Sequence, residues 1–136
     1  MNAYLELLVG PMYSGKSTML IQRAERFERQ KKHVLYVKYA QDNRYSVNSI
    51  STHQLVMKPA LLVQDLVEVI DHIQDRQDLP VDVVVIDEGQ FIKNIDLVDD
   101  LVSKHKKVVI VSALDSDFKR EPFRQITDLI AKAERV

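Results

Sequence analysis

The chain has 136 residues, a length typical of a single domain. Its 19 Lys and Arg residues nearly balance its 20 Asp and Glu residues, so bulk charge does not predict binding to nucleic acid. No apolar run approaches the roughly 20 residues that cross a bilayer. A signal peptide carries a basic segment before its apolar one, and this chain has no basic segment before its first apolar run. We therefore expect a cytoplasmic protein without a membrane or nucleic-acid partner. The absence of cysteine excludes cysteine-ligated zinc, and no zinc is expected.

Short runs rich in Val, Ile and Leu alternate with segments of helical periodicity. The runs cover residues 4–9, 34–39, 81–86 and 108–112. Because each run is mostly apolar and does not alternate strictly with polar residues, it predicts a strand that is covered on both faces, as in a parallel sheet. Residues 40–58 show neither period and indicate a loop with a short hairpin.

Four helices are predicted between and after these strands. The first follows Lys16, the second begins at Pro59, the third is placed to be capped by Asn94, and the last begins near Pro122. Their apolar stripes comprise Met19, Leu20, Ala24 and Phe27; Leu62, Leu66, Val69, Ile70 and Ile73; Ile95, Val98, Leu101 and Val102; and Phe123, Ile126, Leu129, Ile130 and Ala133. This β-α-β-α-β-α-β-α order predicts an α/β three-layer sandwich with a mostly parallel sheet.

A phosphate-binding pattern, GxxxxGK(S/T), lies between the first strand and the first helix. It comprises Gly10, Pro11, Met12, Tyr13, Ser14, Gly15, Lys16 and Ser17. The glycines allow backbone N–H groups and the helix N-terminus to surround an anion. Lys16 is suited to the β- and γ-phosphates and the Ser17 hydroxyl to Mg²⁺. The alternative is a glycine turn that matches by chance, which the strand-loop-helix order disfavours.

A second pattern, four apolar residues ending in an acid, covers residues 83–91. Asp87 falls at the carboxyl end of a strand, where open α/β sheets bind ligands, and is placed to hold Mg²⁺. Glu88 directly after it suits a general base that faces the γ-phosphate. Its alternative is a solvated acid at a strand end. These two patterns indicate a nucleotide site but do not identify the acceptor.

Five segments together resemble the thymidine kinase family of the cytosolic type, which has a RecA-like core. They are LELLVGPMYSGKSTMLIQR, VKYAQDNRYS, STH, VIDEGQF and ALDSDFKREPF, and the resemblance runs from Leu5 to Val136. It implies a P-loop NTPase fold, ATP and Mg²⁺ as cofactors, and thymidine or a related deoxynucleoside as substrate. It also implies that the protein forms a homo-oligomer, because members of the family are commonly tetramers.

The resemblance also implies roles for individual residues. Glu88 corresponds to the base that takes the proton of the deoxyribose 5′-hydroxyl, and Ser17 and Asp87 to the Mg²⁺ ligands. The implied nucleotide-binding residues are Gly10, Pro11, Met12, Tyr13, Ser14, Gly15, Lys16, Ser17, Thr18, Asp42, Asn43, Arg44, Asp87, Glu88, Gly89 and Gln90. The implied nucleoside wall comprises Met12, Phe91, Phe118 and Phe123.

Some of these residues have ordinary alternatives. Phe123 also belongs to a helix stripe and is equally suited to core packing. Arg44 is suited to a solvated surface position. Phe118, flanked by charged residues after a strand, fits a ligand wall better than a core.

The chain departs from the family at its end. Family members follow the core with a small zinc-binding domain and a lasso loop over the thymine, whereas residues 1–136 are expected to form one kinase core alone. This departure leaves open a catalytically impaired nucleotide-binding or oligomerisation module, and an ATPase in which Glu88 activates water. By analogy with RecA-like cores, the strand at 108–112 is expected to lie between the two motif strands. An exposed edge on the first strand would favour self-association.

Overall fold

A computed structural model of the chain describes residues 2–11, 15–40, 49–51, 57–76, 78, 80–114 and 123–133. Seven strands, four α-helices and two 3₁₀ helices are present in this part of the chain. The strands are β1 (Leu5–Val9), β2 (Val34–Tyr39), β3 (Ser49–Ser51), β4 (Met57–Pro59), β5 (Leu61–Val63), β6 (Val83–Asp87) and β7 (Val108–Ala113). The helices are α1 (Lys16–Arg29), α2 (Leu66–Asp75), η1 (Gly89–Phe91), η2 (Ile95–Leu97), α3 (Val98–Ser103) and α4 (Arg124–Ile130).

Five of the strands form one sheet in the order β1-β7-β6-β2-β5, and every pair in it is parallel. The α/β fold with a parallel sheet is therefore confirmed. Strand β7 lies between the strand before the phosphate loop and the strand that ends in Asp87, as the RecA-like analogy predicts. Among the described residues, β1 pairs with β7 alone and forms one edge of the sheet.

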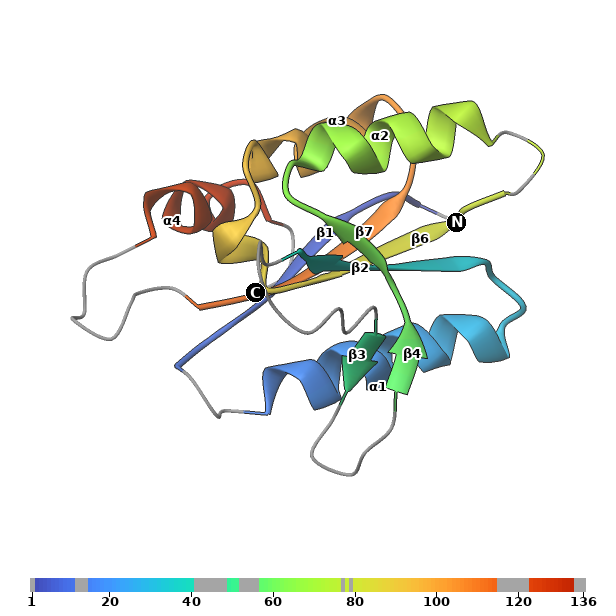
Figure 1. Cartoon of the computed structure of the whole chain (residues 1–136), viewed down its shortest axis with the longest axis horizontal. Helices are drawn as coiled ribbons and strands as arrows, with labels where there is room; N and C mark the ends of the chain where they lie inside the picture. Colours follow the sequence, from blue (N-terminus) through green and yellow to red (C-terminus); the bar gives the residue numbers. More distant parts are fainter. Residues whose placement is uncertain are drawn as a thin grey trace.

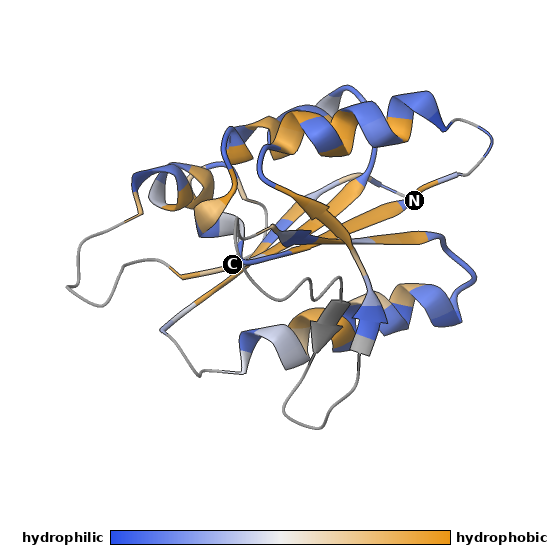
Figure 2. Ribbon diagram, in the orientation of Figure 1, coloured by the Kyte–Doolittle hydropathy of each residue, from blue (hydrophilic) through white to orange (hydrophobic). Residues whose placement is uncertain are grey.

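Helices cover both faces of this sheet. Helix α1 lies on one face, and α2, α3 and α4 lie on the other (Figure 1). The central strands are hydrophobic along their length, and the helices are hydrophobic mainly where they face the sheet (Figure 2). Side chains alternate along a strand, so Val83 and Val85 pack in the core under α1 whereas Val84 and Ile86 pack in the core on the opposite face. In the part of the chain that the structure describes, no helix is long and apolar enough to cross a membrane.

The second helix begins later than its apolar stripe predicts. Leu62 lies in β5, a short parallel strand beside β2, and α2 starts at Leu66. The start is set by Asp65, which accepts a hydrogen bond from the Val67 N–H, while the Glu68 carboxylate accepts one from the Asp65 N–H. This reciprocal capping box ends the extended segment, and three apolar residues before it fit a strand as well as a helix.

The remaining differences are local. The expected hairpin is present as the antiparallel pair β3–β4. Asn94 precedes η2 with a positive φ of 57°, but its side chain does not cap that helix and instead donates to both carboxylate oxygens of Asp65 at 3.1 Å. The third helical segment begins as η2 and continues as α3. Helix α4 begins at Arg124, because Phe123 is still extended.

Candidate active site

The phosphate loop joins β1 to α1, and its described residues are Gly10, Pro11 and Gly15 to Ser17. Gly15 has a φ of +82°, which residues with a Cβ atom rarely adopt. A Cβ atom built at Gly15 would meet no atom within 4 Å, so the backbone conformation alone requires glycine there. This turn aims the first amides of α1 toward the carboxyl edge of the sheet.

Helix α1 presents an uncapped N-terminus to this edge. No side chain caps the helix in the described structure, and its first turn contains no acidic residue. The N-terminus therefore retains the partial positive charge that favours a bound anion. The Lys16 ammonium donates a hydrogen bond to the Pro11 carbonyl and so lies over the loop. Thr18 is half-buried in the same first turn.

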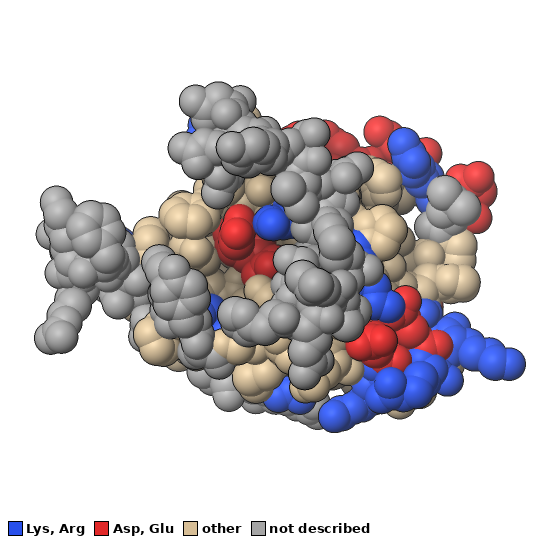
Figure 3. Space-filling model, turned by 60° about the horizontal axis from the view of Figure 1, so that its bottom comes forward, with Lys and Arg blue, Asp and Glu red and all other residues tan. Residues whose placement is uncertain are grey.

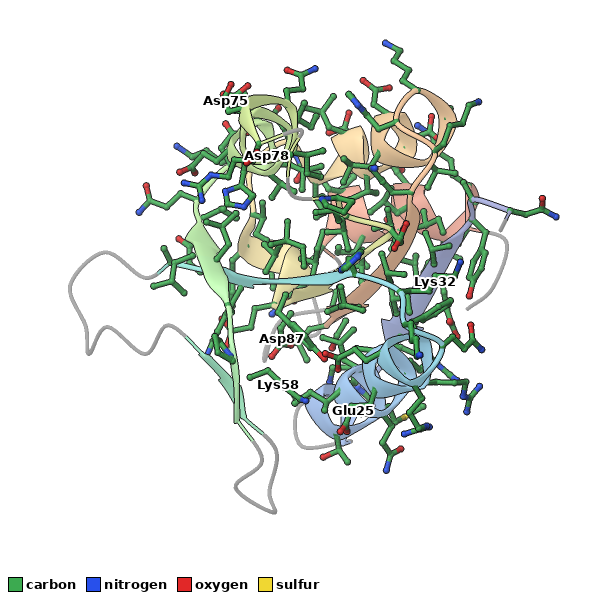
Figure 4. The ribbon with its side chains drawn as sticks, turned by 90° about the vertical axis from the view of Figure 1, so that its right-hand side faces the viewer. Glu25, Lys32, Lys58, Asp75, Asp78 and Asp87 are labelled. Atoms are coloured by element: carbon green, nitrogen blue, oxygen red, sulfur yellow. The ribbon has the colours of Figure 1, made fainter. Side chains whose placement is uncertain are left out.

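The two nucleotide motifs meet through Ser17 and Asp87. The Ser17 hydroxyl donates a hydrogen bond of 3.1 Å to Oδ2 of Asp87, across 70 residues of sequence. Asp87 is 7% exposed, at the carboxyl end of β6, and lies between the sheet and α1 (Figure 4). Burial raises the pKa of this carboxyl, while hydrogen bonds from Ser17 and the Glu88 N–H and the charges of Lys38 and Lys16 oppose the rise. The structure thus brings together the two side chains that the sequence suggests as magnesium ligands.

Glu88 leaves the strand in a left-handed conformation, with a φ of 58°. This turn directs the chain from β6 into η1 and brings Glu88 beside Asp87. Burial raises the pKa of the Glu88 carboxyl, the Lys38 charge opposes this rise, and the neighbouring Asp87 charge adds to it. Its Oε2 is buried and accepts no hydrogen bond from the described residues. A buried carboxylate oxygen without a donor is suited to accept a proton from a hydroxyl group that enters the site.

Gly89 and Gln90 hold the following turn against β7. A Cβ atom at Gly89 would lie 2.6 Å from Cγ1 of Val111, so only glycine allows this close approach. Oε1 of Gln90 accepts a hydrogen bond of 3.0 Å from the Leu114 N–H, at the end of β7. Both residues thereby fix the position of Glu88 and Phe91 on either side of them.

Three aromatic rings line the edge of the sheet beyond this turn. The Phe91 ring is 5.4 Å from Tyr39 and 6.0 Å from Phe123, measured between ring centroids. Phe91 is 45% exposed, which is unusual for so large an apolar side chain. Phe123 is half-buried and packs against the core under α4, so it belongs to both the core and the wall. These rings form an apolar surface suited to a flat heterocycle.

Tyr39 and Lys38 also reach the site, and the sequence did not single them out. Both are half-buried at the carboxyl end of β2, the strand next to β6. The available signal was their position as the last two residues of a predicted parallel strand, where ligands bind in such sheets. Because successive side chains of a strand point to opposite faces of the sheet, Tyr39 lies among the aromatic rings and Lys38 lies on the face that carries α1.

Several residues expected at the site lie outside the described residues. They are Met12, Tyr13, Ser14, Asp42, Asn43, Arg44 and Phe118. The described site consequently comprises the ends of the phosphate loop, the carboxylates at the end of β6 and directly after it, and the aromatic wall.

The Ser17 hydroxyl and the Asp87 carboxylate fit a magnesium ion. Mg²⁺ prefers oxygen ligands and is commonly held by one or two protein groups together with phosphate oxygens and water. These two oxygens already lie 3.1 Å apart beside the phosphate loop. No cluster of three or more His, Cys, Asp or Glu side chains that could hold a metal ion is found within the described ranges.

A parallel sheet with a phosphate loop after β1, an acid after β6 and β7 between them defines a P-loop nucleotide-binding protein of the RecA-like type. The thymidine kinase family model matches residues 3–136. The chain is 38% identical over 135 residues to the thymidine kinase of Yaba monkey tumor virus, covering 99% of this chain and 71% of the relative. It is 39% identical to that of Variola virus and 38% to that of Vaccinia virus strain Ankara, covering 99% of this chain and 73% of each relative. The chain belongs to the thymidine kinase family.

Proposed function

We propose that the protein transfers the γ-phosphoryl group of ATP to the 5′-hydroxyl of thymidine or a related deoxynucleoside. Family membership supports the substrate class. The observation that carries the proposal is the buried Oε2 of Glu88, which has no hydrogen-bond partner among the described residues. Glu88 directly follows Asp87, which meets Ser17, and precedes the turn that carries Phe91 of the aromatic wall. A hydroxyl that is held there by a nucleoside on the wall would face the phosphate side of the site.

The chain's own residues divide the work of the reaction. The α1 N-terminus and Lys16 bind the phosphate chain, and Ser17 and Asp87 would hold Mg²⁺, which neutralises charge on the phosphate oxygens. Glu88 accepts the proton of the 5′-hydroxyl at Oε2 as the hydroxyl oxygen bonds to the γ-phosphorus. The bond between that phosphorus and the bridging oxygen breaks, and ADP leaves. Phe91, with Tyr39 and Phe123 beside it, orients the base.

A module that only binds nucleotide is not favoured. Nucleotide binding alone does not explain a buried carboxylate oxygen that lacks a hydrogen-bond donor. Hydrolysis of ATP does not explain an exposed aromatic wall beside the proposed base. Mg²⁺ dependence, a homo-oligomer of the tetrameric type and a cytoplasmic location remain predictions. The position of β1 at the sheet edge supports self-association.

The replacement Glu88→Gln tests the proposed function. It keeps the size of the side chain and removes its ability to take a proton, so kcat should fall by about 10²–10⁴-fold while ATP affinity is kept. Formation of thymidine monophosphate from ATP, Mg²⁺ and thymidine measures kcat, and equilibrium binding measures the affinity. Glu68→Gln, which alters a carboxylate at the start of α2, is the control. Undiminished turnover in Glu88→Gln would remove Glu88 from the mechanism, and phosphate release that does not require thymidine would favour an ATPase.

A further inference from the structure

Lys38 is the register partner of Asp87 on the neighbouring parallel strand. Side chains alternate along β2, so Lys38 shares a face with Tyr36, whose hydroxyl donates a 2.7 Å hydrogen bond to Glu28 on α1. Asp87 points to that same face, where it meets Ser17. The Lys38 side chain therefore extends from the carboxyl end of β2 toward the phosphate side of the site.

Within the described ranges, the Lys38 side chain makes no hydrogen bond and no ion pair, although the residue is half-buried. Lys58 on β4 differs, because its ammonium lies 3.7 Å from Glu25 and 3.6 Å from Glu28 on α1 (Figure 4). When the α1 side of the molecule is turned forward, acidic and basic side chains lie next to each other in a hollow near its middle (Figure 3). A half-buried cation without a fixed partner retains its capacity to bind an incoming anion.

The charge of Lys38 acts on both carboxylates of the site. Among the described residues it is the one cation that opposes the rise in the pKa of Glu88, and it has the same effect on the pKa of Asp87. Two carboxylates beside a bound triphosphate would repel its γ-phosphoryl group. A cation on this side of the site offsets that repulsion, while Lys16 acts from the loop on the other side.

We propose that Lys38 is a second catalytic lysine, which contacts the oxygens of the γ-phosphoryl group during its transfer to the 5′-hydroxyl. The inference rests on the proposed function for the identity of the phosphoryl acceptor. The part that concerns nucleotide binding does not depend on that acceptor. The step is the transfer described above: the proton goes to Glu88, the phosphoryl group goes to the sugar oxygen, and ADP is released. Lys38 supplies positive charge and hydrogen bonds to the equatorial oxygens and exchanges no proton.

The test compares Lys38→Met, which keeps the length of the side chain and removes its charge, with Lys38→Arg, which keeps the charge. Lys58→Met is the matched control, because it removes a lysine on the same side of the sheet that is already paired with α1. Binding of a non-hydrolysable ATP analogue and of ADP is measured with Mg²⁺ present, and kcat and KM are measured with thymidine. Thermal unfolding establishes that each variant is folded, and Lys38→Gln replaces Lys38→Met if the latter does not fold.

Lys38→Met should lower the affinity for the triphosphate analogue about tenfold and leave ADP binding unchanged, because only the triphosphate carries the γ-phosphoryl group. Its kcat should fall by about 10²–10³-fold with the KM for thymidine within about twofold. Lys38→Arg should recover part of both losses, and Lys58→Met should change neither.

Equal binding of both nucleotides by Lys38→Met and the unaltered protein would overturn the inference, as would equal losses for ADP and the triphosphate analogue. A lower kcat with unchanged preference for the triphosphate would also overturn it, because Lys38 would then act through Glu88 and not on the phosphoryl group. If the unaltered protein forms no thymidine monophosphate, the proposed function fails while the nucleotide-binding comparison still decides the role of Lys38.

Discussion

Gly89 allows the turn after Asp87 to pack directly on β7, and Gly89→Ala tests this contact. The new Cβ atom would lie 2.6 Å from Cγ1 of Val111, well inside van der Waals contact. Val111 is fully buried in the central part of the sheet, and its β-branched side chain is restricted at χ1. The turn must therefore move away from β7 to admit the methyl group.

Overpacking of this kind typically costs about 1–3 kcal/mol of unfolding free energy. For a chain of this length, such a loss lowers the melting temperature by about 3–10 °C. The displaced turn carries Glu88 and Phe91 on its two ends, so kcat should fall in the folded variant as well. Urea unfolding followed by circular dichroism measures the stability, and thymidine phosphorylation measures the activity.

Val111→Ala provides the control, because it removes the atom that the new methyl group would meet. Alone it leaves a cavity and is itself destabilising, by about 1–3 kcal/mol. In the double variant the clash is gone, so the combined loss should be smaller than the sum of the single losses by about 1 kcal/mol or more. A Gly89→Ala protein within about 0.5 kcal/mol of the unaltered one, or additive losses in the double variant, would refute a steric role for Gly89.

Two further predictions concern the aromatic wall and the start of α2. Phe91→Leu should raise the KM for thymidine about tenfold without changing ATP affinity, because base stacking on an aromatic ring is lost; an unchanged KM would place the nucleoside elsewhere. The second prediction concerns the pKa of Asp65, which lies below the ordinary value of 3.8. The largest cause is the hydrogen bond that the charged carboxylate accepts from the Val67 N–H, and the next is the hydrogen bond that it accepts from the Asn94 side chain. The contribution of Asp65 to stability is therefore present above pH 3.8 and is lost as pH falls through the lowered pKa. The stability difference between the unaltered protein and Asp65→Asn should shrink between pH 6 and pH 2.5 in urea unfolding, and a constant difference would contradict this linkage.

The nucleotide-binding half of the site could be predicted from the sequence because its signals are local. The phosphate loop needs a glycine at a position with positive φ, followed by a lysine and a hydroxyl at the start of a helix, and these residues are contiguous. Asp87 follows an unbroken apolar run, which indicates both a buried strand and the end of that strand. The order of the strands followed from the family's RecA-like core, and the structure confirms it.

The contacts that complete the site join residues that are far apart in the sequence. Lys38 lies on the same face as the Asp87 side chain because the register of β2 on β6 places it opposite Asp87, and Tyr39 meets Phe91 because alternation sends it to the other face. Asn94 looked like a helix cap, but the packing of two loops gave its side chain a carboxylate partner instead.

Local patterns thus determined the phosphate-loop turn and the acid at the end of β6, since a backbone turn and a strand end are properties of a few neighbouring residues. Only the tertiary structure decided which further side chains face that site, because a one-residue change of strand register would turn each of them to the opposite side of the sheet.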